Sequence, residues 1–268
     1  MGVIEYRPPL GSLPGEWEPP AIELAPPSAA LEVEHVHPYA RVVHGALTAS
    51  DCARLIAAMA ASGRAAPVSV SGHPTGDTSL GSVRATAWAP ELAAKLWAKL
   101  AAGIEAERSM DERTPTDWYA LDGRLAHRRW RAVGLGPVLR FMRYEAGGRH
   151  CAHYDAGFDY PDARRSLMSL VVYLTTVEPG TGGRTRIVDD GQADLPLPAR
   201  DHDDWTREVR DDEVVTAVRP VAGQVLVFDH RLCHDVERYT GAGSRVIVRG
   251  DVVYQALDEG ALDEGALA

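Results

Sequence analysis

Two histidines and one aspartate in this sequence have the types and the order of a metal site. His153 and Asp155 are two residues apart, and His234 follows much later in the chain. Residues two apart in an extended strand point to the same face, so His153 and Asp155 can bind one ion, and a distant strand can bring His234 to it. Two neutral imidazoles and one carboxylate cover one face of an octahedral ion such as Fe(II) and leave about three of its six positions free. The sequence therefore predicts a metal site that is open to further ligands.

Other histidines compete for this role. His202 and Asp204 form a second His-x-Asp pair, but they lie in an acidic stretch without a flanking strand pattern. His150 should lie on the opposite face from His153 if the strand is regular. His230 could bind the metal if its strand ends early. We interpret His150 and His230 as residues that support or pack against the ligands.

Two cysteines lie next to the candidate ligands, Cys151 and Cys233. Thiolates bind soft metals. A thiolate on an Fe(II) ion exposed to oxygen would itself be oxidised, so we expect both cysteines to be small core residues. Together with Cys52 they make an odd and sparse set, which favours reduced thiols in a cytosolic protein.

Arg245 is the main candidate for an anion-binding residue. It opens the alternating run Arg245-Val-Ile-Val-Arg249-Gly-Asp251, in which strand parity places Arg245, Arg249 and Asp251 on one face. Two arginines on a face that also meets a metal need anionic partners. A dicarboxylate co-substrate would supply one partner and Asp251 another, although an arginine in such a strand is more often part of a surface ion pair.

The bulk composition excludes several classes of protein. With 268 residues and 45% hydrophobic residues, the chain can bury a large core as one domain. Its net charge of −10 disfavours a nucleic-acid partner, which would require a basic face. No apolar run reaches the roughly 18–20 residues of a membrane span, and the N-terminus has no secretory signal pattern. We expect a cytoplasmic protein without membrane contact, and the sequence does not indicate its oligomeric state.

The first part of the chain predicts an arm and two helices. Residues 1–30 are rich in proline, which disfavours helix and sheet, so they should form an arm laid over the body or a loose tail. The segment from Thr48 to Asp51 resembles a capping box at the start of a helix. A second helix should run from about Pro90 to Arg108, with Pro90 near its first position.

The second part of the chain has short β-rich runs separated by glycine, proline and aspartate. The runs cover residues 138–144, 167–176, 224–228 and 245–254. Many short strands after two helices favour a mainly β member of the α+β class, a sandwich or jelly roll with the helices packed outside. The expected organisation is an arm over 1–30, a single domain over 31–256 and a low-complexity acidic tail over 257–268. Within the domain we expect helical support over about 46–110, a jelly-roll core over about 130–254 and an acidic insert or lid over about 189–213.

Five motifs follow one another over about residues 130–254. They are Arg140-Phe-Met-Arg-Tyr144 with the first two ligands, Arg165-Ser-Leu-Met-Ser-Leu-Val-Val-Tyr173, Gly182-Gly183-Arg-Thr185, Pro220-Val-Ala-Gly223 leading to His234, and Arg245. In this order they resemble the prolyl 4-hydroxylase-like branch of the Fe(II)/2-oxoglutarate-dependent dioxygenases. The resemblance implies a double-stranded β-helix core, which is jelly-roll or cupin-like, with N-terminal supporting helices.

The resemblance also implies roles for individual residues. His153, Asp155 and His234 would hold Fe(II), and Arg245 would pair with the distal carboxylate of 2-oxoglutarate. Tyr144 and Tyr173 match tyrosines that line the co-substrate pocket and donate hydrogen bonds from their hydroxyl groups. The cofactors implied are Fe(II), 2-oxoglutarate as co-substrate and O₂, with ascorbate as a supporting reductant.

The implied reaction is the hydroxylation of an unactivated C–H bond with release of succinate and CO₂. Related halogenases have a small residue where this chain has Asp155, so the aspartate indicates a hydroxylase, although a desaturase or cyclase would use the same scaffold. The chain departs from the family after Gly-Gly-x-Thr, where Arg186 and Ile187 replace a frequent aromatic residue. The acidic insert follows there, so the departure concerns the substrate side of the site.

The substrate is only weakly encoded. Arg249, Arg143 or Arg149 could hold a substrate carboxylate, but internal pairs with Asp251 or Glu145 are equally consistent with the sequence. We expect a small molecule, an amino acid or an amino-acid-derived metabolite. The alternative is a prolyl or other side chain on a protein or carrier-bound substrate. A binding module with an inert jelly roll is the third reading, which the complete ligand set disfavours.

Overall fold

The computed structural model describes residues 16–27, 30–68, 81–109, 129–160, 164–195, 199–201 and 206–257. Expectations for the first residues of the arm, for the His202 and Asp204 pair and for the acidic tail beyond residue 257 therefore lie outside the described residues.

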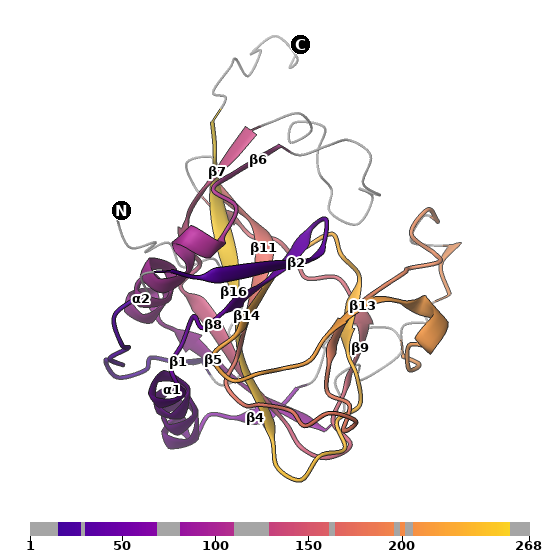
Figure 1. Cartoon of the computed structure of the whole chain (residues 1–268), viewed down its shortest axis with the longest axis horizontal. Coiled ribbons are helices and arrows are strands. Elements are labelled where there is room, and N and C mark those ends of the chain that lie inside the picture. Colours follow the sequence, from indigo (N-terminus) through magenta and orange to yellow (C-terminus); the bar gives the residue numbers. More distant parts are fainter. Residues whose placement is uncertain are drawn as a thin grey trace.

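The described chain folds mainly into β-strands, which form a large and a small sheet (Figure 1). The large sheet has the order β1-β5-β8-β16-β11-β14-β3-β2, and the small sheet has the order β13-β12-β15-β9. The strands of the large sheet are β1 Glu16–Trp17, β2 Glu32–His37, β3 Ala40–His44, β4 Ala66–Pro67, β5 Ser82–Trp88, β6 Glu107–Ser109, β7 Arg129–Leu135, β8 Val138–Tyr144, β10 Asp159–Tyr160, β11 Arg164–Tyr173, β14 Val225–Asp229 and β16 Arg245–Ala256. Those of the small sheet are β9 His150–His153, β12 Thr185–Val188, β13 Val214–Val218 and β15 His234–Val236.

The core is the predicted jelly roll, a double-stranded β-helix. From β8 onward the chain crosses repeatedly between the sheets, with β8, β11, β14 and β16 in the large sheet and β9, β12, β13 and β15 in the small one. All pairings among these strands are antiparallel. Apolar residues from both sheets, among them Met142, Val171, Ile187 and Val236, pack into one cluster between them. The mainly β class and the jelly-roll core expected from the sequence are confirmed.

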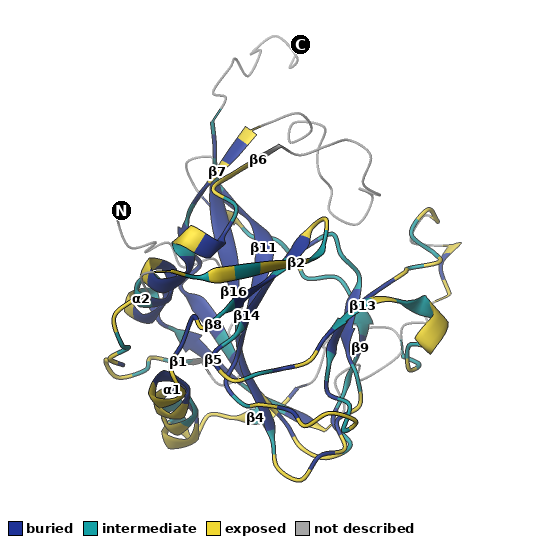
Figure 2. Cartoon of the chain, viewed as in Figure 1, coloured by how far each residue is buried: buried dark blue, intermediate teal, exposed yellow. Residues whose placement is uncertain are grey.

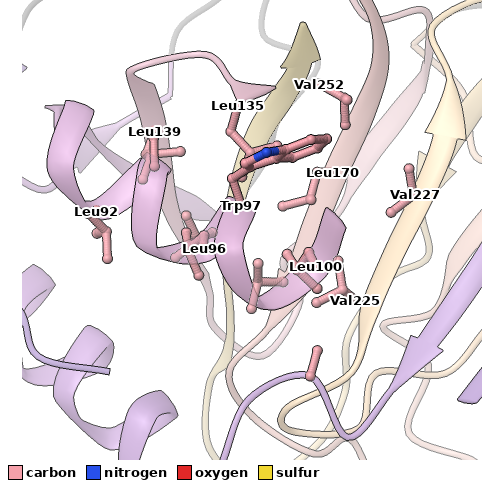
Figure 3. Close-up of a cluster of buried hydrophobic side chains, with 14 of the residues drawn as sticks. Leu92, Leu96, Trp97, Leu100, Leu135, Leu139, Leu170, Val225, Val227 and Val252 are labelled. Atoms are coloured by element: carbon pink, nitrogen blue, oxygen red, sulfur yellow. The ribbon is translucent and has the colours of Figure 1, made fainter. Parts of the chain in front are cut away.

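Two helices, α1 (Ala49–Ser62) and α2 (Pro90–Leu100), cover the outer face of the large sheet. In Figure 3 the leucines of α2, Leu92, Leu96 and Leu100, lie against strand residues such as Leu139 and Leu170. Strand β11 is buried on both faces, because the helices cover one face and the small sheet covers the other (Figure 2). None of the helices in the described part of the chain has the length and apolarity to cross a membrane.

Helix starts are predicted better than helix ends. The capping box at Thr48 and Asp51 is present, and Pro90 begins α2. The predicted extension of the second helix to about Arg108 is wrong, because α2 ends at Leu100 and a short 3₁₀ turn, η1 (Ala101–Gly103), follows. At Gly103 the chain passes so close to β3 that an added Cβ would lie 2.9 Å from a Val43 methyl.

The segment expected to give helical support also contains sheet strands. Strand β5, residues 82–88, lies between the two helices in sequence and pairs along its whole length with β8. It therefore widens the large sheet beyond the eight core strands. The region between 46 and 110 therefore supplies both the outer helices and strands at one side of the large sheet.

The described part of the N-terminal arm is held against the body by one buried ion pair. Asp51 and Lys99 are almost fully buried, and the lysine Nζ lies 3.6 Å from the aspartate carboxylate. The Asp51 carboxylate accepts hydrogen bonds from the amides of Ala25 (2.8 Å) and Thr48 (3.0 Å). Lys99 donates to the carbonyl oxygens of Ala25 (2.8 Å) and Pro26 (3.1 Å). This pair joins the arm, α1 and α2.

We predict that Asp51→Asn and Lys99→Met each destabilise the protein by about 3–5 kcal/mol, because each leaves one buried charge without its partner. Lys95→Met is the control, since Lys95 pairs with the largely exposed Glu23 and should change stability by less than about 1 kcal/mol. Urea unfolding at pH 7 measures the difference. Stability of both buried variants within the control's range would contradict the role of the pair.

The same pair predicts a pH dependence. Burial raises the pKa of the Asp51 carboxyl, but the amides of Ala25 and Thr48 and the charge of Lys99 outweigh it, so the net shift is downward. A group with a lowered folded-state pKa contributes stability at neutral pH, and that contribution is lost as the pH falls through the acid range. The gap in unfolding free energy between wild type and Asp51→Asn should therefore narrow as the pH is lowered below about 4. A gap that stays constant down to pH 3 would show that the carboxylate charge is not what stabilises the arm.

Candidate active site

The three candidate metal ligands lie together between the sheets. His153 ends β9, His234 begins β15, and the two residues are directly paired across these antiparallel strands. Asp155 follows two residues after His153. The ligand atoms lie within 4.8 Å of one another, and the Nε2 atoms of His234 and His153 are 3.6 and 3.9 Å from carboxylate oxygens of Asp155. Within the described residues this is the one cluster of at least three such side chains that could hold a metal ion.

Both imidazole rings are held in place by a hydrogen bond from Nδ1 to a backbone carbonyl oxygen. The Nδ1 atom of His153 lies 2.8 Å from the carbonyl oxygen of Cys151, and that of His234 lies 3.1 Å from the carbonyl oxygen of Leu232. A carbonyl oxygen only accepts hydrogen bonds, so each Nδ1 carries a hydrogen and Nε2 is the ring nitrogen left to face a metal. Burial, reinforced by the charge of the neighbouring His153, lowers the pKa of His234 to about 3.

Asp155 is oriented and kept ionised by residues of the large sheet. The Ser169 hydroxyl on β11 donates to Oδ2 of Asp155, and the Nη2 atom of Arg249 on β16 lies 3.0 Å from its Oδ1. Burial raises the pKa of the Asp155 carboxyl, but Arg249 and the two histidines outweigh it and hold the pKa well below its usual range. The carboxylate is therefore charged at neutral pH.

A cavity of about 400 Å³ opens beside the three ligands. It lies between the sheets, and its wall combines the ligands with side chains of β8 and β16 on the inner face of the large sheet. The wall residues include Met142, Tyr144, Val171, Thr185, Val236, Arg245 and Ile247. The cavity is largely apolar with a few charged groups, which is typical of small-molecule sites.

Arg245 lies in this wall with its side chain completely buried. Its Nε donates to the carbonyl oxygen of Gly183 (2.8 Å), and its Nη2 donates to the hydroxyl of Thr185 (2.9 Å). The guanidinium lies over the Tyr144 ring, 4.9 Å from the ring centroid. Among the described residues its buried Nη1 has no hydrogen-bond partner. A buried charged donor without a partner is costly, so the geometry suits an anion in the cavity.

The two glycines of the Gly-Gly-x-Thr motif allow the tight turn that brings Gly183 and Thr185 to Arg245. Gly182 and Gly183 have φ values of 69° and 70°, a backbone region that other residues rarely adopt. A Cβ on Gly182 would lie 2.0 Å from the carbonyl oxygen of Arg238. The tight turn carries the Gly183 carbonyl to Arg245 and places Thr185 at the start of β12.

The two tyrosines that were expected to line the co-substrate pocket lie differently. Tyr144 lies in the cavity wall below the Arg245 guanidinium. Tyr173 is fully buried behind the wall and donates its hydroxyl hydrogen to Thr185 (3.0 Å). Burial raises the pKa of Tyr173 to about 12, so it remains a donor. Thr185 thus accepts from both Tyr173 and Arg245, and Tyr173 acts on the cavity through Thr185.

His150 does not lie on the opposite face from His153, as a regular strand would require. The two rings are stacked, with centroids 4.0 Å apart, and both line the cavity. The β9–β15 register explains the difference. His153 pairs with His234 but His150 pairs with Val236, so three residue steps on one strand match two on the other. This bulge turns His150 to the metal side, although it is not in the ligand cluster.

The three arginines considered for a substrate carboxylate occupy different places. Arg249 lines the cavity, but it lies within 3.0 Å of both Asp155 and Asp251. Arg143 is half-exposed and pairs with Glu145 at 2.7 Å. Arg149 donates to the carbonyl oxygen of Thr206 at 3.3 Å. The structure brings Arg249 to the cavity wall and does not bring Arg143 or Arg149 there.

A buried charge network behind Asp155 was only partly foreseen. Asp251 lies 3.0 Å from Arg249, 3.2 Å from Nη1 of Arg140 and 3.3 Å from Nε2 of His230. His230 is thus a packing partner of Asp251 and is not part of the ligand cluster. Burial raises the pKa of Asp251, but Arg249, His230 and Arg140 outweigh it, and the pKa falls to about 2. Arg140 was missed as a site residue, although its parity with Tyr144 could have indicated it.

The remaining sequence features near the site are structural. Cys151 is buried, with its Sγ 3.2 Å from the carbonyl oxygen of Thr206, and Cys233 is partly exposed. Neither cysteine is in the ligand cluster. Arg186, which replaces a frequent aromatic residue, is buried in β12 and pairs through two hydrogen bonds with Asp235 of β15. This bidentate pair links two strands of the small sheet.

The residues present fit both an Fe(II) ion and 2-oxoglutarate. The ion would be held by His153, Asp155 and His234, whose ligand atoms lie close together and line the cavity. The unpartnered Nη1 of Arg245 fits the distal carboxylate of the co-substrate.

We predict that Ser169→Ala lowers the affinity for Fe(II) about 10–100-fold, because residues that orient a metal ligand contribute to that extent. Asp155→Ala should lower it further, since a ligand itself is lost, and it should abolish turnover. His202→Ala should bind metal as the wild type does. Titration with Fe(II) under nitrogen, followed by calorimetry, measures all three. Unchanged affinity in Asp155→Ala together with a loss in His202→Ala would place the metal in the acidic insert.

Comparison with known proteins agrees with this geometry. Residues 139–250 match the family model described as the 2OG-Fe(II) oxygenase superfamily. No curated protein matches the chain. Among solved structures, the chain is similar to the viral collagen prolyl hydroxylase vCPH from Paramecium Bursaria Chlorella virus-1 in complex with 2OG, with 18% identity and a TM-score of 0.43 over 81% of this chain and 96% of that one.

Two further solved structures are similar to a comparable degree. HygX from Streptomyces hygroscopicus, with nickel, 2-oxoglutarate and hygromycin B bound, has 16% identity and a TM-score of 0.43 over 81% of this chain and 82% of that one. A prolyl hydroxylase from Trichoplax adhaerens, in complex with a hypoxia inducible factor peptide fragment, has 13% identity and a TM-score of 0.47 over 80% and 82%.

All of these TM-scores lie below 0.5, so the similarity rests on the family match over residues 139–250 and on the geometry of the site. The matched region holds the complete ligand cluster and the buried arginine. Residues 139–250 are therefore similar to the 2OG-Fe(II) oxygenase superfamily, and the ligand cluster and the buried Arg245 within them suit the iron and the co-substrate of that family.

Proposed function

We propose that this protein is a 2-oxoglutarate-dependent dioxygenase that hydroxylates an unactivated C–H bond of a small molecule, an amino acid or an amino-acid-derived metabolite, and releases succinate and CO₂. The observation that carries the proposal is the completely buried Arg245, whose Nη1 has no partner among the described residues, in the same cavity as the three metal ligands. A carboxylate at Arg245 and a metal at the ligand cluster are the two attachment points that 2-oxoglutarate needs.

In this proposal each residue has one task. His153, Asp155 and His234 hold Fe(II), and Arg245 pairs with the distal carboxylate of 2-oxoglutarate. Tyr144 lies against the same guanidinium, and Tyr173 orients Thr185 toward it. Bound Fe(II) and 2-oxoglutarate together supply the activation of O₂ and the oxidation of the C–H bond.

The protein's own contribution is to orient groups and to keep water away. Ser169 and Arg249 fix the two oxygens of Asp155, which leaves the carboxylate one orientation toward the metal. Met142, Val171 and Ile247 give the cavity an apolar wall beside the reacting groups. Such a wall limits side reactions with water.

The size of the cavity supports a small-molecule substrate. Its volume of about 400 Å³ falls in the range of roughly 300–1,000 Å³ that is typical of small-molecule sites. A prolyl or other side chain on a protein or carrier-bound substrate is the alternative, and desaturation or ring closure on the same scaffold is a variant of the chemistry. Mass spectrometry distinguishes hydroxylation from desaturation, since hydroxylation adds one oxygen atom and desaturation removes two hydrogens.

We further propose that the described part of the acidic insert, residues 189–195, 199–201 and 206–213, lies at the cavity entrance. Tyr154, in the cavity wall next to the ligands, donates its hydroxyl hydrogen to Asp190 at 2.7 Å. Asp190 also pairs with the buried Arg200, which donates to the carbonyl oxygens of Ala193 and Leu195. These contacts support attachment of the insert at the rim and a role for it in substrate access.

We predict that Arg245→Gln raises the KM for 2-oxoglutarate about 10–100-fold, because a buried hydrogen-bonded charge pair is lost. Arg245→Lys should retain part of the affinity, since it keeps the charge but not the planar fork. Arg219→Gln is the matched control, because Arg219 is exposed and bonds only to the carbonyl oxygen of Val177 among the contacts described. Succinate release with Fe(II) and ascorbate measures the effect.

Two outcomes would contradict the proposal. A folded wild-type protein that releases no succinate from 2-oxoglutarate, with or without candidate substrates, would be a binding module. An Arg245→Gln variant with an unchanged KM for 2-oxoglutarate would place the co-substrate elsewhere in the cavity.

A further inference from the structure

A fourth arginine, Arg84, lies in the cavity wall on β5. The strand register places it beside Met142 of β8, which is itself beside Ile247 of β16. All three side chains line the cavity. Arg84 was not among the sequence-based candidates, and the metal, the co-substrate and the charge network described above make no use of it.

Arg84 differs from the other cavity arginines in having no hydrogen-bond or ion-pair partner among the described residues. Arg140 pairs with Asp251, Arg249 pairs with Asp155 and Asp251, and Arg245 donates to Gly183 and Thr185. For Arg84, no hydrogen bond or ion pair to any other described residue is formed in the structure. Burial and the repulsion from Arg249 lower its pKa. A half-buried guanidinium beside a second arginine is unfavourable unless an anion compensates it.

A count of the formal charges around the cavity points the same way. Among the described residues, four arginines line it, Arg84, Arg140, Arg245 and Arg249, and two carboxylates lie in or against it, Asp155 and Asp251. The arginines and carboxylates sum to +2 (4 − 2 = 2). Fe(II) and the 2-oxoglutarate dianion cancel each other, so the loaded cavity keeps this excess. A neutral substrate would leave the excess uncompensated.

The position of Arg84 separates it from the co-substrate arginine. Arg84 and Arg245 lie on strands with β8 between them, so their backbones are roughly 10 Å apart across the sheet. Arg245 is also held by its own hydrogen bonds at the start of β16, two residues along the strand from Ile247, which lies in the row of Arg84. Two anions can therefore bind in the cavity at the same time.

We propose that Arg84 binds a carboxylate of the substrate, so that the enzyme acts on an anionic small molecule whose acid group anchors it on β5. This inference rests on the proposed function, because it requires that 2-oxoglutarate occupies Arg245. It selects molecules with a free carboxylate and a net negative charge, such as N-acyl amino acids, over their amides and esters.

The first experiment compares acids with their amides. The protein is loaded with Mn(II) and 2-oxoglutarate under nitrogen, and the L-amino acids, their N-acetyl derivatives and the carboxamides of both are titrated by calorimetry. We expect at least one acid to bind about ten-fold or more tightly than its own amide. The same acid should gain one oxygen atom in air with Fe(II), as measured by mass spectrometry.

The second experiment tests the residue. Arg84→Gln should raise the Kd of the preferred acid about 10–100-fold and leave its amide and 2-oxoglutarate within about two-fold. Arg84→Lys should recover part of the affinity for the acid, because it restores the charge. The control is Arg64→Gln, an exposed arginine after α1, which should leave all three Kd values unchanged.

Each outcome decides between the proposals. If no acid in the panel is preferred over its amide while 2-oxoglutarate still binds and succinate is still released, the inference about Arg84 is wrong and the proposed function stands. An Arg84→Gln variant that weakens 2-oxoglutarate instead of the acid would assign Arg84 to the co-substrate. Failure to bind 2-oxoglutarate at all would overturn the proposed function itself.

Discussion

The pairing of β9 with β15 is the constraint on which the active site depends. Its register sets His153 opposite His234, and the bulge in β9 turns His150 to the same side. A shift of one residue would move every side chain of a strand to the other face. The small sheet holds this register through its apolar inner residues and through the buried pair between Arg186 and Asp235. The arrangement of the candidate metal ligands thus depends on contacts outside the ligand cluster.

The large sheet provides the partners for the charges that are buried between the two sheets. Asp155 leaves the small sheet and meets Ser169 and Arg249, which come from two neighbouring strands of the large sheet. Arg249 in turn meets Asp251, and Asp251 meets Arg140. Opposite charges alternate along this row, so each buried ion has a partner. The row ties the metal ligand to the middle of the large sheet, where the backbone is least exposed.

Sequence reasoning found the parts whose signal is local. The spacing of His153 and Asp155, the strand at 138–144 and the capping box at Thr48 all depend on neighbours in the chain, and the structure has the strand and the cap where they were expected. It failed where distant packing decides. The β9 bulge is set by β15, and the end of α2 is set by the approach of Gly103 to Val43. Arg84 was missed because β5 lies between two helical patterns and has few large aliphatic residues.

Strand β5 lies outside the eight core strands, and it also precedes the region that matches the oxygenase family. It pairs with β8 and contributes Arg84 to the cavity wall. It takes no part in the pairing of β9 with β15 or in the row of buried charges from Asp155 to Arg140. If Arg84 anchors the substrate as proposed, substitutions on this strand change which molecules bind and leave the candidate metal ligands and their charged neighbours in place, so selectivity and chemistry reside on separate parts of the fold.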